Sequence, residues 1–265
     1  MKPPIFNPFW PDQVKAIHAH DMQEMWDARL APHLFNCYHD ELGRYLAIAG
    51  RAPLRILDVG CAQATLSLLL AEAGHRVTAV DLRPEFLDYA RTRYEKGEID
   101  FVQGNVMELD LLDRLVLVFA NQLLEHLVYP VEMIRGLSRL LRPGGRFVAT
   151  TPSGLYLKSS LPLYRELGNP DDYRDRQFFP DGDGHFFAYS PGELREIAVE
   201  AGLAQVQVAH YATPWITGHM RVRHLHGRVP VGVLRALDRL CLSGPRWLVR
   251  KWAYQLMLQG VRPDE

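Results

Sequence analysis

Strand-like and helix-like segments alternate between residues 54 and 151, and this alternation constrains the fold more than any other feature of the chain. Five short apolar segments predict strands, at 54–59, 76–80, 99–103, 115–120 and 146–151. Three intervening segments have helical apolar spacing, at 64–73, 84–96 and 131–141. Repeated strand–helix–strand units form a parallel sheet covered by helices. We therefore predict an α/β fold with a Rossmann-like, mostly parallel sheet and helices on both faces.

The rest of the chain divides around this sheet. We expect an N-terminal arm and helices over 1–49, the sheet domain over 50–210, and a C-terminal helical extension over 211–265. Within the domain, the irregular segment 153–190 is rich in aromatic residues, glycine and aspartate, which is typical of a substrate lid. A helix over 191–201 and a strand over 206–209 follow, and the extension contains predicted helices at 231–242 and 246–258.

Charge and cysteine content exclude several classes of protein. The net charge is −1, so no nucleic-acid partner is expected. Three widely spaced cysteines, Cys37, Cys61 and Cys241, lack the spacing of a zinc site or disulfide framework, and we expect no metal. No apolar run is long enough to span a bilayer, and the first residues lack an apolar signal region. We expect a cytoplasmic protein, and leave open whether it is a monomer or a homodimer.

The first strand ends in a pattern suited to nucleotide binding. Asp58 lies at its end, and Gly60 begins the turn into the next helix. Ligands of open α/β sheets bind at the carboxyl ends of strands, where a glycine lets the backbone approach closely. Asp81 ends the second strand 21 residues after Gly60. A carboxylate there can accept hydrogen bonds from two ribose hydroxyls.

A dinucleotide is disfavoured as the ligand. From Gly60 the chain reads Gly-Cys-Ala-Gln-Ala-Thr, without the further glycines of the fingerprint GxGxxG. Those glycines allow a pyrophosphate to meet the N-terminus of the helix. A dehydrogenase is therefore the weaker alternative.

Four segments resemble, in order, the motifs of class I S-adenosylmethionine-dependent methyltransferases. LDVGCAQATLSLLLAEAGHRVTAVDL resembles the first two motifs, and VQGNVMEL at 102–109 lies at the third strand. ANQLLEHLVYPVEMIRGLSRLLRPGGRFVATTPSG at 120–154 is similar to the fourth and fifth motifs. GHFFAYSPGELREIAVEAGL at 184–203 resembles the following segment in the small-molecule branch of the superfamily.

This resemblance implies S-adenosylmethionine as cofactor, S-adenosylhomocysteine as product, and a small-molecule acceptor. It places Asp58 and Gly60 around the methionine end of the cofactor, and Asp81 on the ribose. Contacts with the adenine would come from Leu82, Asn105 and the backbone N–H of Val106. The residues beside the sulfonium would be Asn121 and Gln122.

The chain departs from the family pattern in the first motif and at two later strands. Ala62 and Ala64 stand where the second and third glycines are usual, Asn105 replaces an aspartate, and Val116 replaces the aspartate that begins the fourth strand. An alanine methyl group needs little room, so we expect cofactor binding to survive. The altered turn nevertheless motivates an alternative, a non-catalytic protein that binds the cofactor or a partner through the same fold.

Two histidines are candidates for the catalytic base. Methyl transfer is an in-line displacement that mainly requires alignment, together with a base when the acceptor is an alcohol or ammonium. His126 follows the fourth strand, and His185 lies in the predicted lid. An imidazole can take a proton near neutral pH, but either ring could equally be a packing residue. We predict methyl transfer to an oxygen or nitrogen of a small molecule.

Overall fold

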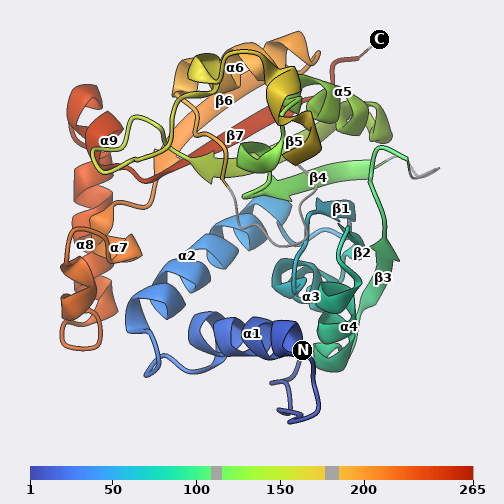
Figure 1. Ribbon diagram of the computed structural model, residues 1–265, viewed down its shortest axis with the longest axis vertical. Helices are drawn as coiled ribbons and strands as arrows, with labels where there is room; N and C mark the ends of the chain where they lie inside the picture. The colour runs from blue at the N-terminus through green and yellow to red at the C-terminus, as the bar shows by residue number, and fades with distance from the viewer. Residues whose placement is uncertain (109–114, 177–184, 265) are drawn as a thin grey trace.

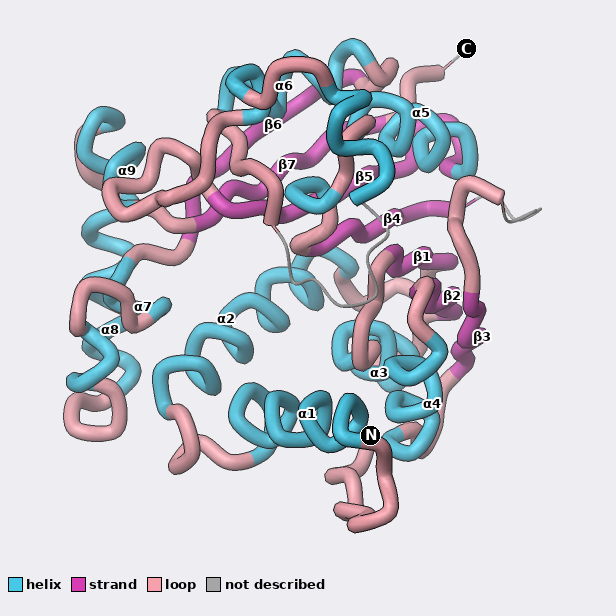
Figure 2. The backbone as a smooth tube through the Cα atoms, in the orientation of Figure 1, coloured by secondary structure: helices cyan, strands magenta, loops and turns pink. Residues whose placement is uncertain are grey.

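The computed structural model describes residues 1–108, 115–176 and 185–264 and contains a seven-stranded sheet in the order β3-β2-β1-β4-β5-β7-β6. The strands β1 to β5 are mutually parallel, and β7 is antiparallel to both β5 and β6. Their bounds are β1 Arg55–Val59, β2 Arg76–Asp81, β3 Glu98–Gln103, β4 Leu115–Asn121, β5 Leu141–Pro152, β6 Ala204–Tyr211 and β7 Gln255–Val261. The predicted mostly parallel α/β sheet is confirmed, and Figure 2 shows it as one magenta band across the molecule.

Helices cover both faces of the sheet. In Figure 1, α5 (Pro130–Leu140) and α6 (Pro191–Glu200) lie above it, and α2 (Pro32–Ala49) and α3 (Thr65–Glu72) lie below it. Separate groups of buried apolar side chains fill the two interfaces. Helix α4 (Pro84–Arg93) connects β2 to β3. The two packed faces hold the strands in place, so the side chains at the strand ends have fixed positions.

The N-terminal residues form helices, as predicted. Helix α1 (Asp12–Asp21) continues into a short π-helix, η1 (Met22–Trp26), and α2 begins after an extended residue, Ala31. Pro32 is the first residue of α2, a position that proline favours because its fixed φ suits the first turn. The proline therefore suits the start of a new helix at this position.

The C-terminal segment differs from the prediction. It contains α7 (Pro214–Thr217), the 3₁₀ helix η5 (Val222–Leu225), α8 (Val231–Leu242) and α9 (Arg246–Trp252). The prediction of a helix over 246–258 is wrong beyond Trp252, because residues 255–261 form β7 between β5 and β6. Leu256 and Leu258 pack on one face of the sheet and Met257 on the other. Burial on both faces removes the alternating pattern that identifies a strand.

Part of the predicted lid can be located. The described residues between β5 and α6 include two 3₁₀ helices, η3 (Tyr164–Glu166) and η4 (Pro170–Arg176). Leu163, Leu167 and Phe187 are buried, so this irregular segment packs on the core. Residues 177–184 of the predicted lid lie outside the described residues. Among the helices described, none is both long and apolar enough to cross a membrane.

Candidate functional site

Three polar residues occupy the carboxyl ends of adjacent parallel strands. Asp58 is the penultimate residue of β1, Asp81 is the last residue of β2, and Asn121 is the last residue of β4. Because these strands are parallel neighbours, the three residues lie along one edge of the sheet. This is the edge at which open α/β sheets bind ligands.

Asp58 is buried beneath this edge. Its side chain is 3% exposed and accepts a hydrogen bond of 2.6 Å from the hydroxyl of Ser67, in α3. Burial, together with the nearby charge of Asp81, raises the pKa of Asp58 to about 7, although the Ser67 hydrogen bond acts in the opposite direction. Near neutral pH this carboxyl can therefore be neutral or ionised, and it can accept or donate a hydrogen bond.

The carboxylate of Asp81 closes the turn after β1. One oxygen accepts a hydrogen bond from the backbone N–H of Ala62, and the other accepts one from the N–H of Arg83, both at 2.9 Å. The side chain lies at the ligand-binding edge of the sheet and also stabilises the turn. Leu82 beside it is 48% exposed and offers an apolar surface.

The turn keeps a left-handed backbone despite its alanines. Gly60, Ala62 and Ala64 have φ values of 65°, 47° and 54°. At Gly60 a Cβ would come within 3.1 Å of the end of the Leu123 side chain, which would have to move by a few tenths of an ångström. Ala64 is fully buried and packs with Ala79, away from solvent. The two alanines therefore preserve the shape of a glycine-rich turn.

Hydrogen bonds of the Asn105 side chain hold the loop after β3. The Asn105 side-chain oxygen accepts a hydrogen bond from the Met107 N–H at 3.1 Å, and its amide nitrogen donates to Glu108 Oε1 at 3.0 Å. Val106 is 5% exposed and belongs to the core. The predicted contact of Asn105 with adenine would therefore compete with these local hydrogen bonds.

Asn121 and Gln122 differ in their surroundings. The Asn121 side-chain oxygen is buried without a hydrogen-bond partner in the described part of the chain. Gln122 has a φ of 48°, and its amide nitrogen donates to Gln255 Oε1 at 2.9 Å and to Thr150 Oγ1 at 3.2 Å. Gln122 thus links β4 to β5 and β7, whereas Asn121 has a free acceptor for a ligand.

The two candidate bases lie together. The ring centroids of His126 and His185 are 4.8 Å apart, and a Glu125 carboxyl oxygen lies within 4.8 Å of a ring nitrogen of each. Glu125 is fully buried, neither of its oxygens has a hydrogen-bond partner among the described residues, and burial raises its pKa to about 8. Glutamate and histidine can also hold a divalent cation, so the expected absence of a metal stays a prediction.

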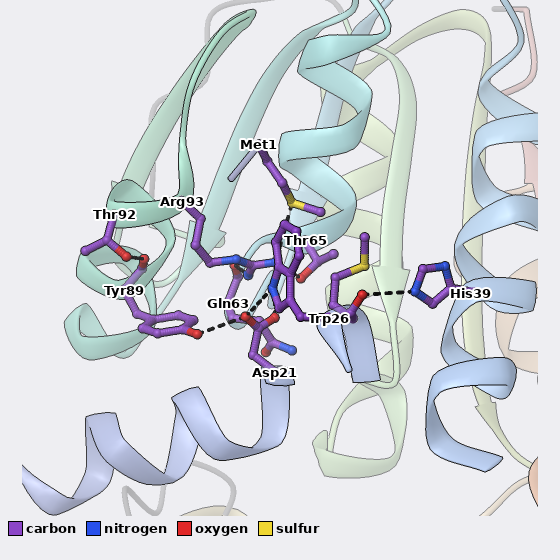
Figure 3. A network of polar contacts seen from close by, with 10 residues as sticks. Met1, Asp21, Trp26, His39, Gln63, Thr65, Tyr89, Thr92 and Arg93 are labelled. Carbon is purple, nitrogen blue, oxygen red and sulfur yellow. Dashed lines mark hydrogen bonds and ion pairs between the residues drawn. The ribbon is translucent and has the colours of Figure 1, made fainter. Parts of the chain in front are cut away.

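A buried ion pair that the sequence did not indicate supports the turn from below. The Arg93 guanidinium lies 3.1 Å from an Asp21 carboxyl oxygen, and both side chains are fully buried. Arg93 also donates to the Gln63 carbonyl and to the Thr65 hydroxyl, each at 2.9 Å. Figure 3 shows these groups converging on the guanidinium. The pair therefore joins α1 and α4 to the turn after β1.

Two aromatic side chains complete this network. The Trp26 indole N–H donates to Asp21 at 2.9 Å, and the Tyr89 hydroxyl donates to the same oxygen at 2.8 Å. Both rings also lie within 6 Å of the Arg93 guanidinium carbon. The network depends on residues separated by up to 72 positions, so neither periodicity nor a short motif could reveal it.

Comparison with known proteins assigns the family. A methyltransferase domain matches residues 57–149. A ubiquinone biosynthesis O-methyltransferase from Coxiella burnetii is 31% identical over 163 residues, which cover 59% of this chain and 67% of that protein. The chain belongs to the class I S-adenosylmethionine-dependent methyltransferase superfamily. The predicted family is thereby confirmed, together with its cofactor, S-adenosylmethionine.

Two further comparisons show how far the resemblance extends. A protein of the same name from Xanthomonas oryzae is 34% identical over 116 residues, which cover 42% of this chain and 47% of that one. The chain thus spans about half the length of the Xanthomonas relatives that it matches. The structure of phosphoethanolamine N-methyltransferase 2 from Haemonchus contortus, in complex with S-adenosyl-L-methionine, aligns with a TM-score of 0.63 at 14% identity, covering 97% of this chain and 59% of that one. At that identity the likeness concerns the fold alone.

Proposed function

We propose that this chain transfers the methyl group of S-adenosylmethionine to an oxygen or nitrogen of a small-molecule acceptor. The observation that carries the proposal is the gathering of Asp58, Asp81 and Asn121 at one edge of the sheet, behind a turn that keeps its left-handed shape. Open α/β sheets bind their ligands at that edge. The buried Asn121 oxygen, which lacks a partner among the described residues, supports the presence of a ligand there.

Different residues near the turn would contact different parts of the cofactor. Asp81 would accept hydrogen bonds from the ribose hydroxyls, using the lone pairs that its two backbone hydrogen bonds leave free. The exposed Leu82 would pack on the adenine. Asn105 and the Val106 N–H would contact the adenine edge, and this requires Asn105 to share or exchange its local hydrogen bonds.

The methionine end would lie near Gly60 and Asp58. Gly60 lets the ligand approach the backbone, and the carboxyl group of Asp58 beneath it can accept a hydrogen bond from an ammonium group. When bound, the cofactor supplies an electrophilic methyl group on a sulfonium. Asn121 would lie beside that group, while Gln122 would fix the end of β4 through Thr150 and Gln255.

The histidine pair would remove the acceptor proton. His185 approaches from the segment after β5 and His126 from the end of β4, so their rings meet where an acceptor could enter. With a pKa of about 8, Glu125 is mostly protonated at neutral pH and can hold or exchange a proton beside either ring. We assign the base to His185, with His126 positioning it.

The proposal includes a small-molecule acceptor and a cytoplasmic location. The Xanthomonas relative is named an O-methyltransferase and the Haemonchus protein an N-methyltransferase, so both acceptor atoms occur among similar proteins. The near-neutral net charge of −1 supports a small molecule over a nucleic acid. Which atom is methylated follows from the acceptor and not from the fold.

Ligand-induced stabilisation tests cofactor binding. S-adenosylmethionine and S-adenosylhomocysteine should raise the melting temperature and NAD should not, because only a ligand of the native state stabilises it. Asp81→Asn should weaken cofactor binding by about tenfold or more, which corresponds to roughly 1.4 kcal/mol. The exposed Asp100→Asn is the matched control. If neither methyl-cycle ligand shifts the melting temperature at millimolar concentration, the chain does not use this cofactor.

Turnover of the histidine variants tests the base. His185→Ala should lower turnover by about 10²–10⁴-fold and leave cofactor affinity nearly intact. Turnover should also survive a chelator, because neither proton removal nor alignment needs a cation. Activity that is lost with the chelator and restored by a divalent metal would instead assign Glu125, His126 and His185 to a metal site. Unchanged turnover in His185→Ala and in the matching His126→Ala would leave alignment alone as the source of the rate.

A further inference from the structure

A pocket of about 410 Å³ opens beside the histidine pair, at the carboxyl end of β5. Its lining comes from residues just after β5, from His185, from the segment after α7, and from Tyr254 immediately before β7. The volume lies in the range typical of small-molecule sites, about 300–1,000 Å³. Because His185 belongs to both the pocket and the histidine pair, a molecule in the pocket lies next to the proposed base.

Three polar atoms on the lining of this pocket lack hydrogen-bond partners. Ser153 Oγ, Tyr156 Oη and His219 Nδ1 are each buried without a hydrogen-bond partner in the described part of the chain. Ser153 is 1% exposed and Tyr156 is 5% exposed. Buried polar atoms without partners are rare, because each has lost its hydrogen bonds to water without replacement. Three of them on the lining of one pocket indicate a polar ligand that supplies the missing partners.

These groups are uncharged at neutral pH and can pair with a polar ligand. Burial raises the pKa of the Tyr156 phenol, so it keeps its proton and can donate it. Burial lowers the pKa of His219, and the neighbouring His33 lowers it further, so its ring is neutral at neutral pH and carries one N–H. Its Nδ1 donates a hydrogen bond in one tautomer and accepts one in the other. Ser153 also offers a hydroxyl hydrogen. Two hydroxyl donors and a neutral imidazole suit a group that accepts several hydrogen bonds.

The charge and shape of the pocket further restrict the chemical class of the ligand. Lys158 supplies one permanent positive charge, and no acidic side chain is present among the described residues that line the pocket. A single cation matches the single charge of a carboxylate better than the double charge of a phosphate. Tyr156, His219 and Tyr254 form an aromatic wall, with ring centroids 4.3–5.8 Å apart. Such a wall favours a flat apolar body.

We propose that this pocket binds the acceptor and selects a small aromatic molecule that carries a carboxylate. The carboxylate would accept hydrogen bonds from Ser153, Tyr156 and His219, with Lys158 contributing charge at the pocket. The aromatic body would extend toward His185, which lines the pocket and whose ring contacts that of His126. The role as an acceptor site rests on the proposed methyl transfer, whereas carboxylate binding can be measured without turnover.

Calorimetry with three probes tests the selection, with S-adenosylhomocysteine present. Benzoate should bind in the millimolar range or better, since a ligand of about nine non-hydrogen atoms can reach that affinity in a matched site. Benzamide has nearly the same shape and no charge, and it should bind at least about tenfold more weakly. Phenyl phosphate provides the dianion. Equal binding of benzoate and benzamide, no saturable binding of benzoate, or tighter binding of phenyl phosphate would overturn the proposal.

Variants of the pocket test the assigned contacts. Tyr156→Phe removes only a hydroxyl and should weaken benzoate binding by about tenfold, as expected for a lost hydrogen bond to a charged group. Lys158→Gln should weaken it by roughly two- to fivefold, because this lysine is exposed and its charge is screened. The exposed Lys96→Gln is the matched control and should change nothing. Benzoate affinity that is unchanged in both pocket variants would place its site elsewhere.

The same experiment separates this inference from the proposed function. A shift in melting temperature with S-adenosylhomocysteine, in wild type and in Tyr156→Phe, shows that cofactor binding is intact. If only benzoate binding is lost, the substitution has acted on the pocket and not on the cofactor site. If S-adenosylhomocysteine does not bind and benzoate still does, methyl transfer is contradicted and the carboxylate site is retained.

Discussion

Ala62 and Ala64 adopt backbone conformations that glycine adopts with less strain. Left-handed conformation costs an alanine about 1–2 kcal/mol, because its Cβ approaches the following carbonyl oxygen. The turn is retained because Asp81 accepts a hydrogen bond from the Ala62 N–H and because Ala64 is packed in the core. Burial and hydrogen bonding thus compensate for the missing glycines.

A glycine at position 62 should therefore stabilise the protein. We expect Ala62→Gly to raise the free energy of unfolding by about 1 kcal/mol, as measured by urea titration. Ala73→Gly is the control with the opposite sign, since Ala73 is exposed and has an ordinary helical φ of −74°. It should lower the free energy of unfolding by roughly 0.5–1 kcal/mol. Destabilisation by Ala62→Gly would show that the methyl group contributes more than the backbone strain costs.

Glu125 makes the stability depend on pH. Burial raises its pKa from 4.5 in the unfolded chain to about 8 in the folded protein, so the folded state binds the proton more tightly. The resulting stabilisation is complete below pH 4.5 and is lost as pH rises through 8. We expect the free energy of unfolding to fall between about pH 5 and pH 8, measured by urea titration at each pH.

Glu125→Gln separates this effect from others. The amide cannot ionise, so most of the pH dependence should disappear and the variant should gain stability relative to wild type as the pH rises. Asp58, whose pKa is raised to about 7, contributes a slope of the same sign that remains in this variant. An unchanged pH profile in Glu125→Gln would mean that Glu125 is ionised in the folded protein, as a bound cation would require.

The positions of the site residues could be predicted better than their contacts. Asp58 and Asp81 lie at the strand ends where the sequence predicted them, because strand ends follow from local pattern. The side-chain contacts of Asn105 and Gln122 depend on which neighbours the fold supplies. The same limit applies to the pairing of His126 with His185, which are 59 positions apart in the chain.

At the level of elements, the buried pair of Arg93 with Asp21 holds the N-terminal helices against the turn. We expect Arg93→Met to lower the free energy of unfolding by about 3–5 kcal/mol, because Asp21 is left as an uncompensated buried charge. Cofactor affinity should also fall, since the Gln63 carbonyl and the Thr65 hydroxyl lose their donor. Both effects can be measured by thermal unfolding with and without S-adenosylhomocysteine.

The matched control lies two residues away. Arg91 forms an ion pair of 2.6 Å with Asp88 on the exposed side of α4, and solvent screens this pair. Arg91→Met should therefore change stability by only about 0–1 kcal/mol and should leave cofactor affinity unaltered. If the two variants behave alike, the Arg93 pair does not support the turn.

The local sequence pattern predicted helix α5 accurately and failed at β7. Helix α5 carries a clear apolar stripe, with Ile134 and Leu137 buried, and was predicted within one residue of its bounds. In β7 the sequence Gln-Leu-Met-Leu-Gln is buried on both faces and shows no alternation. Leucine, methionine and glutamine also favour helices, so local preference pointed to the wrong structure.

For the whole molecule, β7 links the last residues to a sheet built from residues 55 onward. It lies between β5 and β6, and its side chains enter the cores on both faces of the sheet. Loss of packing in β7 should therefore be felt across the sheet, and the chain from α2 to β7 should unfold as one cooperative unit.

Substitution of Leu258, which is fully buried in β7, tests this cooperativity. Leu258→Ala should lower the free energy of unfolding by about 2–5 kcal/mol, because it leaves a cavity between the sheet and its helices. Hydrogen exchange should show the same loss of protection for the amides of β1 as for those of β7. Slowly exchanging amides open only with the cooperative unit to which they belong. Leu240→Ala, at a position 70% exposed on α8, should change neither. A loss confined to β6 and β7, with β1 still protected as in wild type, would mean that the parallel strands with Asp58 and Asp81 can stay folded without the C-terminal strand.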